Sequence, residues 1–244
     1  RGNHEIASVN SQYGFKLHLL QIYNFDDIWR SFQKVFDWLP FGALIGNQIL
    51  CVHGGLSPLL QTVEQIDQIP RPQSEPDNQL LLDILWSDPT TEIKEFGESE
   101  RGIGKAYGPK AICDFCEANK LKWLIRAHQC VNEGIAVIRN TPIITVFSSS
   151  NYTDAVENKS GILLVNESND VEPICLPALK KFRREDSSFF SMTKVYHRGH
   201  ERSVSNTIKT LSSDAKFHNQ THFGFRQIRS TAPRGQRLSE SSAS

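Results

Sequence analysis

Short apolar runs, each followed by a polar loop, recur along the first two thirds of the chain. Four of these runs are rich in β-branched or aromatic residues and have the length of buried strands. They are 49–52 (ILCV), 122–127 (KWLIRA), 143–147 (IITVF) and 161–165 (GILLV). The pattern predicts four short strands in the interior of a sheet structure.

Apolar residues between these runs recur at helical spacing. In 25–39 they return every three or four positions, and two aspartates near its start suit a helix amino terminus. Segments 78–86 and 109–121 have a similar pattern, and Pro109 suits the first turn of a helix. Alternating strands and helices predict an α/β fold with sheets inside and helices outside.

Three of the predicted strands end on loops that carry possible ligands. His53 opens the loop HGGLSP, and His128 lies in RAHQ, each just beyond a strand. The carboxyl ends of strands are where sites assemble in α/β folds. The two glycines after His53 allow a sharp turn and a close approach to a ligand. Either histidine alone is more typical of a structural residue than of a ligand.

The first five residues, RGNHE, combine side chains that suit a phosphate, a metal ion and a proton transfer. The amide oxygen of Asn3 can bind a hard divalent cation, and His4 can serve as a general acid. Arg1 and Arg101 can form bidentate contacts with phosphate oxygens. A chain without an initial methionine that starts on such residues is expected to be a fragment cut through an active-site loop.

Composition adds a second region to this picture. A chain of 244 residues with 39% apolar residues can build one domain core and something more. Residues 1–179 carry 14 Lys and Arg against 22 Asp and Glu, whereas 180–244 carry 13 against 5. The second region is also rich in serine and lacks periodicity. We expect a domain over 1–177 and a basic, mostly disordered tail over 178–244. The tail is either a solvated linker or a regulatory or docking segment, for which phosphorylation stays open.

Other classes of protein are less consistent with the sequence. No apolar run approaches the roughly 18 residues of a membrane helix, so no membrane span is predicted. The five cysteines form no disulfide framework, which predicts a reducing compartment, the cytoplasm or the nucleus. The basic tail lacks interleaved aromatic residues, so a nucleic-acid partner is not expected.

The individual motifs are weak signals, but their order is specific. Along the chain they are RGNHE, HGGLSP, ILWSDPT, SERGI, RAHQ and FSSSNY. In this order and at this spacing they resemble the phosphoprotein phosphatases, a family of metal-dependent serine/threonine phosphatases that includes types 1, 2A, 5 and calcineurin. The resemblance covers residues 1 to about 167.

The resemblance implies an αββα sandwich of the metallophosphoesterase type with two divalent metal ions, Mn, Fe or Zn, where the sheets meet. It implies hydrolysis of phosphoserine and phosphothreonine in proteins, and regulatory subunits as further partners. An acid at His4 has to stay protonated near pH 7, and we expect Glu5, or an aspartate elsewhere, to keep it so. The remaining roles are metal ligands, Asn3, His53 and His128; phosphate ligands, Arg1 and Arg101; and a residue lining the site, Tyr152.

The chain departs from the family at its start. The aspartate motifs of the GDxHG and GDxVDRG types do not occur in these residues, and they supply the first metal ion's ligands. We therefore expect the fold to be incomplete at the amino terminus and residues 1–244 alone to be inactive, with activity in a longer parent. Smaller departures are SSSNYT for SAPNYC and GIGKAYG for an FTFG phrase, so no subtype is assigned.

Two other functions stay open. One is a different metallophosphoesterase, such as a nucleotide pyrophosphatase or phosphodiesterase, although the order of RAHQ and ERGI argues against it. The other is a pseudophosphatase scaffold, which gains weight if the parent also lacks the upstream aspartates.

Overall fold

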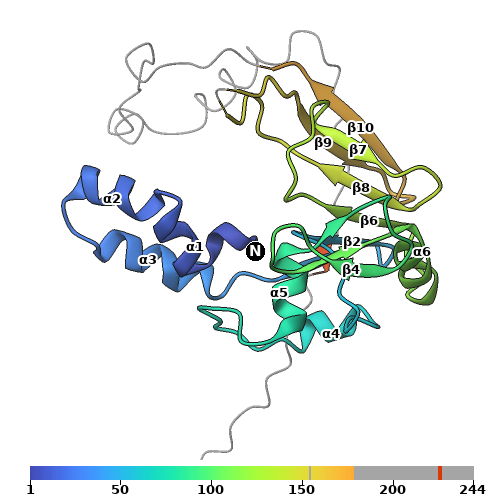
Figure 1. Cartoon of the computed structure of the whole chain (residues 1–244), viewed down its shortest axis with the longest axis horizontal. Helices are drawn as coiled ribbons and strands as arrows, with labels where there is room; N and C mark the ends of the chain where they lie inside the picture. The colour runs from blue at the N-terminus through green and yellow to red at the C-terminus, as the bar shows by residue number, and fades with distance from the viewer. Residues whose placement is uncertain (154, 179–224, 227–244) are drawn as a thin grey trace, which may run out of the picture. The chain divides into compact units, whose positions relative to one another are not determined.

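A computed structural model of the chain describes residues 1–153, 155–178 and 225–226 (Figure 1). These residues belong to one compact unit. The predicted disordered tail, 178–244, lies outside the described residues except for residue 178 and a two-residue strand, β11 (Phe225–Arg226). No helix in the described part is long and apolar enough to cross a membrane.

A six-stranded sheet forms the centre of this unit, and three of its predicted strands are confirmed with bounds that differ by at most one residue at each end. Neighbouring strands β2, β6 and β8 run parallel, whereas the outer pairs are antiparallel. In spatial order after β11, the strands are β1 (Gly42–Ile45), β2 (Ile49–Val52), β6 (Trp123–Arg126), β8 (Ile143–Val146) and β7 (Ile135–Val137).

Alternating side chains give this sheet two apolar faces. On β2, Leu50 and Val52 join one core cluster, whereas Ile49 belongs to the other. The first cluster packs the sheet against the helices; the second packs it against the two-stranded antiparallel sheet. The covering elements are α4 (Glu64–Asp67), α5 (Gln79–Trp86), α6 (Pro109–Ala118), β9 (Ser160–Val165) and β10 (Val171–Leu176).

The described residues thus form three consecutive layers, helices, sheet and sheet, of the predicted sandwich. The prediction of an α/β metallophosphoesterase fold is confirmed. The outer face of the β9–β10 sheet is partly exposed at Ile162 and Leu164 among the described residues.

Two smaller groups of elements, the amino-terminal helices and a three-stranded sheet, complete the described fold (Figure 1). Buried side-chain hydrogen bonds join the amino-terminal helices, because Trp29 Nε1 donates to Asn10 Oδ1 at 2.6 Å and Asn10 Nδ2 donates to Gln33 Oε1 at 2.9 Å. A three-stranded sheet follows α5. The elements are η1 (Asn3–Glu5), α1 (Ala7–Gln12), α2 (Phe15–Tyr23), α3 (Asp27–Phe36), β3 (Asp88–Pro89), β5 (Lys105–Tyr107) and β4 (Phe96–Glu98).

Candidate metal and phosphate site

The two candidate histidine ligands follow neighbouring parallel strands. His53 comes directly after β2, and His128 lies two residues beyond β6. Ala127 N donates to His53 O at 3.0 Å, which extends the pairing of β2 and β6 to the histidine loop. Because both strands point the same way, their carboxyl ends bring the two imidazole rings to a centroid distance of 4.9 Å.

Asn3 reaches the same point from the short helix η1. His53 Nε2 lies 2.7 Å from Asn3 Oδ1 and 3.2 Å from His128 Nδ1. The Asn3 residue is only 2% exposed. The structure therefore brings the three side chains together, as the sequence-based hypothesis requires, and their role as metal ligands stays a prediction.

Glycines next to Asn3 and His53 lie in tight contact with neighbouring segments. A Cβ at Gly2 would lie 2.9 Å from both His53 Nδ1 and Glu5 Oε2. A Cβ at Gly54 would lie 2.7 Å from Leu85 C, and one at Gly55 would overlap the phenol of Tyr107. No other residue type fits such positions without displacing backbone or a buried ring.

Burial sets the charge state of the histidines. It is the main cause that lowers the pKa of His53 to about 3, with the charges of His128 and Arg126 adding to it. Burial, with help from Arg101, lowers the pKa of His128 to about 4. Both imidazoles are therefore neutral at pH 7, and a neutral imidazole has a ring nitrogen available to a metal.

The environment of His128 fits a ligand role. Its backbone φ of 56° lies in the left-handed region, which is uncommon outside glycine and often occurs at functional sites. Its Nδ1 is the nitrogen that faces His53 Nε2, and the Trp86 ring packs edge-on against the imidazole with the ring centroids 5.7 Å apart.

One amide oxygen and two imidazole nitrogens form a donor set that suits Mn, Fe or Zn. No three His, Cys, Asp or Glu side chains of the described ranges gather as a metal site. The third donor here is instead the amide of Asn3.

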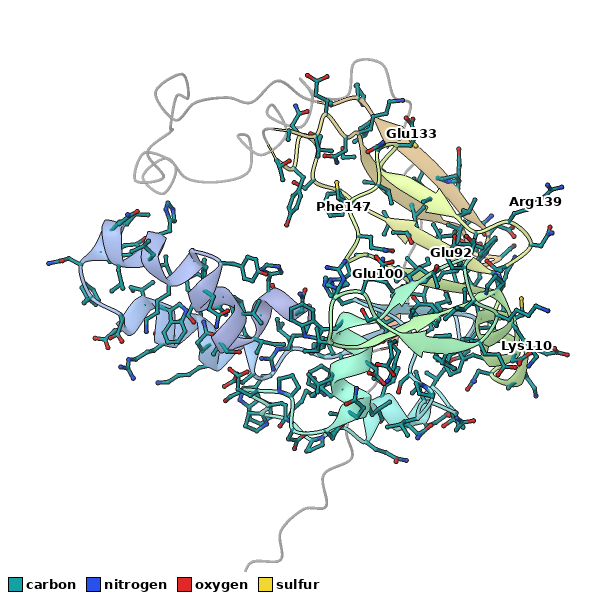
Figure 2. All side chains as sticks on the ribbon, viewed as in Figure 1. Glu92, Glu100, Lys110, Glu133, Arg139 and Phe147 are labelled. Atoms are coloured by element: carbon teal, nitrogen blue, oxygen red, sulfur yellow. The ribbon has the colours of Figure 1, made fainter. Side chains whose placement is uncertain are left out.

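Arg101 lies close enough to His128 for its charge to lower the pKa of that imidazole. Its Nε donates to Asp88 Oδ2 at 2.5 Å, and its side chain is 37% exposed. Within the described residues its terminal nitrogens have no hydrogen-bond partner. Arg101, Asp88 and Gln129 help to line a cavity of about 380 Å³. Glu92 and Glu100, both labelled in Figure 2, line the same cavity.

The predicted phosphate-binding role of Arg1 does not fit its placement. Its guanidinium donates to the carbonyl oxygens of Gln73, Glu5 and Ser74, and its side chain is only 2% exposed. A buried guanidinium whose terminal nitrogens bind main-chain oxygens is not available to a phosphate. Arg1 instead joins the first turn to the segment at 73–74.

Glu5 also has a different role from the one expected. Its Oε2 accepts a hydrogen bond from Gly2 N at 2.6 Å and so closes the turn of η1. The His4 ring is exposed and packs edge-on against Tyr13 at 4.9 Å. It forms no hydrogen bond with any described residue, so the part of the chain described here does not support the expected contact with Glu5.

Tyr152 lies on the loop after β8, and its ring packs edge-on against Phe147 with the ring centroids 5.0 Å apart. It is 53% exposed, and its backbone N donates to Asn158 Oδ1 at 3.0 Å. Among the described residues, no contact joins Tyr152 to Asn3, His53 or His128. Its role in lining the site stays a prediction.

Sequence reasoning missed Arg126 and Asp88. Arg126 is among the largest fully buried side chains of the described residues, and it pairs with Asp88 through Nη2 and Oδ1 at 2.6 Å. A signal was present, because Arg126 shares a sheet face with the core residue Leu124 on β6. An arginine at a core position predicts a buried and paired charge.

A model of the calcineurin-like phosphoesterase family matches residues 1–132. The chain belongs to this family. It is 37% identical over 167 residues to the serine/threonine-protein phosphatase PP1-delta of Caenorhabditis elegans. The aligned region covers 68% of this chain and 55% of that protein. The predicted resemblance to the phosphoprotein phosphatases is confirmed.

A solved structure agrees with this assignment. The fold is similar to that of a protein serine/threonine phosphatase from Saccharomyces cerevisiae with similarity to human phosphatase PP5. The TM-score is 0.68 at 30% identity, over 74% of this chain and 60% of that one. The chain therefore spans little more than half the length of these phosphatases.

Proposed function

We propose that this site takes part in the hydrolysis of phosphoserine and phosphothreonine in proteins. The observation that carries the proposal is the convergence of three donor atoms: Asn3 Oδ1 and His128 Nδ1 both lie within hydrogen-bond distance of His53 Nε2. The similarity of the chain to two serine/threonine phosphatases supports the choice of phosphoserine and phosphothreonine as the substrate class.

Each residue has a separate task in this proposal. Asn3, His53 and His128 would hold a divalent cation, Mn, Fe or Zn. When bound, such an ion polarises phosphoryl oxygens and lowers the pKa of a coordinated water. The exposed guanidinium of Arg101 orients the phosphate through its terminal nitrogens.

His4 would then donate a proton to the departing serine or threonine oxygen. An alkoxide is a poor leaving group, so this proton transfer lowers the barrier for the natural substrates. The imidazole is exposed, so a substrate can reach it.

The proposal extends to the protein's surroundings. These residues supply ligands to one of the two metal ions that the resemblance implies. Phosphoproteins are the proposed substrates and regulatory subunits the further partners. The reducing compartment is the cytoplasm, the nucleus or both.

The test compares substrates with the natural protein that contains these residues. We expect it to hydrolyse phosphoserine and phosphothreonine peptides, and not dinucleotide polyphosphates. His53→Gln should abolish turnover, whereas His18→Gln, at an exposed position on α2, should leave it unchanged.

Preferential cleavage of the dinucleotide would assign the site to another metallophosphoesterase. Metal binding without hydrolysis of either substrate would favour the pseudophosphatase scaffold. Either result would overturn the proposed function.

A further inference from the structure

We propose that Asp88 and Arg126 form a positioning pair that fixes the guanidinium of Arg101 beside the histidine cluster. This inference rests on the proposed function, because it assigns to Arg101 the task of binding phosphate. Neither Asp88 nor Arg126 needs to touch the substrate for this task.

Arg126 ties three segments of the site together. Its Nε donates to Gly54 O at 2.7 Å, in the loop that begins with His53. Its Nη2 donates to Ser87 O at 3.1 Å, just beyond α5, and its Nη1 donates to Gln129 Oε1 at 2.8 Å, beside His128. The guanidinium therefore holds both histidine loops and the end of α5 in one arrangement.

Burial restricts the guanidinium of Arg126 to this arrangement. Arg126 is 1% exposed, and a buried charge is stable only when its donors are paired. Its remaining partner is Asp88 Oδ1, at 2.6 Å from Nη2. Because Arg126 has no access to water, its hold on this oxygen fixes the carboxylate.

The fixed carboxylate of Asp88 in turn holds the side chain of Arg101 in place. Asp88 Oδ2 accepts from Arg101 Nε at 2.5 Å, so the two oxygens of one carboxylate each bind one arginine. Contact through Nε leaves the two terminal nitrogens of Arg101 for a phosphate. A lysine could not be held on one side and bind with a fork on the other.

Charge and geometry predict opposite effects when Asp88 becomes asparagine. Removal of a negative charge beside Arg101 would by itself attract phosphate more strongly. The buried Arg126 should keep the amide oxygen, which turns the amide NH₂ towards Arg101 Nε, a donor facing a donor. Loss of positioning therefore weakens phosphate binding, against the electrostatic trend.

The test uses the natural protein, loaded with Mn²⁺, and inorganic phosphate as the probe. Calorimetry should show that Asp88→Asn raises the phosphate Kd at least fivefold, while the Mn²⁺ Kd stays within twofold of the unmodified protein. Glu100→Gln is the matched control, because Glu100 lines the same cavity and no hydrogen bond joins its carboxylate to Arg101 in the described part. It should not raise the phosphate Kd.

A double-mutant cycle separates positioning from general stability. In an Arg101→Ala background, Asp88→Asn should change the phosphate Kd by less than 1.5-fold. An unchanged or tighter phosphate Kd in the single variant, or a full effect without Arg101, would overturn the positioning role. A joint loss of phosphate affinity, Mn²⁺ affinity and melting temperature would likewise show a structural role only. No phosphate binding by the unmodified protein would overturn the proposed function as well.

Discussion

The low pKa values of the two histidines lead to a prediction about metal binding in acid. Protons compete with a metal for imidazole nitrogen, so an ordinary histidine loses metal affinity below its pKa. The perturbation is a change from pH 7.5 to pH 5.5. The measured quantity is the dissociation constant of Mn²⁺ from the 244-residue chain.

The magnitude follows from the fraction of neutral imidazole. With an ordinary pKa of 6.5, that fraction falls about tenfold over this interval, so two such ligands would weaken binding about a hundredfold. Burial lowers the pKa of His53 to about 3 and that of His128 to about 4. At pH 5.5 both then stay almost wholly neutral, and proton competition begins only below about pH 5. We predict that the Kd changes by less than about threefold.

The free Mn²⁺ signal in electron paramagnetic resonance measures this constant, even for weak binding. His18→Gln is the control for an exposed histidine and should leave the Kd unchanged. His53→Gln should remove the binding. A loss of tenfold or more between pH 7.5 and 5.5 in the unmodified chain would show that the ligands titrate as ordinary histidines, and would refute the argument from burial.

Three further predictions concern packing, Arg1 and the proton donor. Gly55→Ala should destabilise the fold by about 2–4 kcal/mol in denaturant unfolding, because the new Cβ displaces buried Tyr107. The control is Gly14→Ala, where the site has open space but a φ of 92°, and it should cost only about 1–2 kcal/mol. Equal losses of stability in the two variants would contradict the packing argument. Arg1→Ala should cost about 2–4 kcal/mol through lost buried hydrogen bonds and leave the phosphate Kd of the natural protein within twofold; a tenfold weaker Kd with unchanged stability would restore its predicted phosphate role. His4→Asn should slow phosphoserine hydrolysis far more than aryl phosphate hydrolysis, whose leaving group needs little protonation, and equal losses on both would exclude His4 as the acid.

Strongly apolar elements could be predicted from the sequence, and weakly apolar ones could not. The run 49–52 forms β2 with the predicted bounds, because four apolar residues in a row, three of them buried, favour an interior strand. The helix predicted over 25–39 spans only Asp27–Phe36. Strands β1 and β4 escaped prediction, since each is short and contains a glycine, and none of their positions is fully buried.

The candidate site shows a similar division. Motif order identified Asn3, His53 and His128, which the fold brings together although they are far apart in the chain. The phosphate role assigned to Arg1 stays a prediction that its placement does not favour, because residue type does not reveal which way a side chain points. Its neighbour Asn3 faces the histidines, whereas Arg1 binds the carbonyl oxygens at 73–74.

The most direct test of the metal site is an anomalous diffraction measurement on crystals of the 244-residue chain soaked in Zn²⁺. We predict one peak about 2.0–2.2 Å from Asn3 Oδ1, His53 Nε2 and His128 Nδ1. The peak should be absent from crystals of His53→Gln. Zinc bound elsewhere, with no density among these three atoms, would contradict the account.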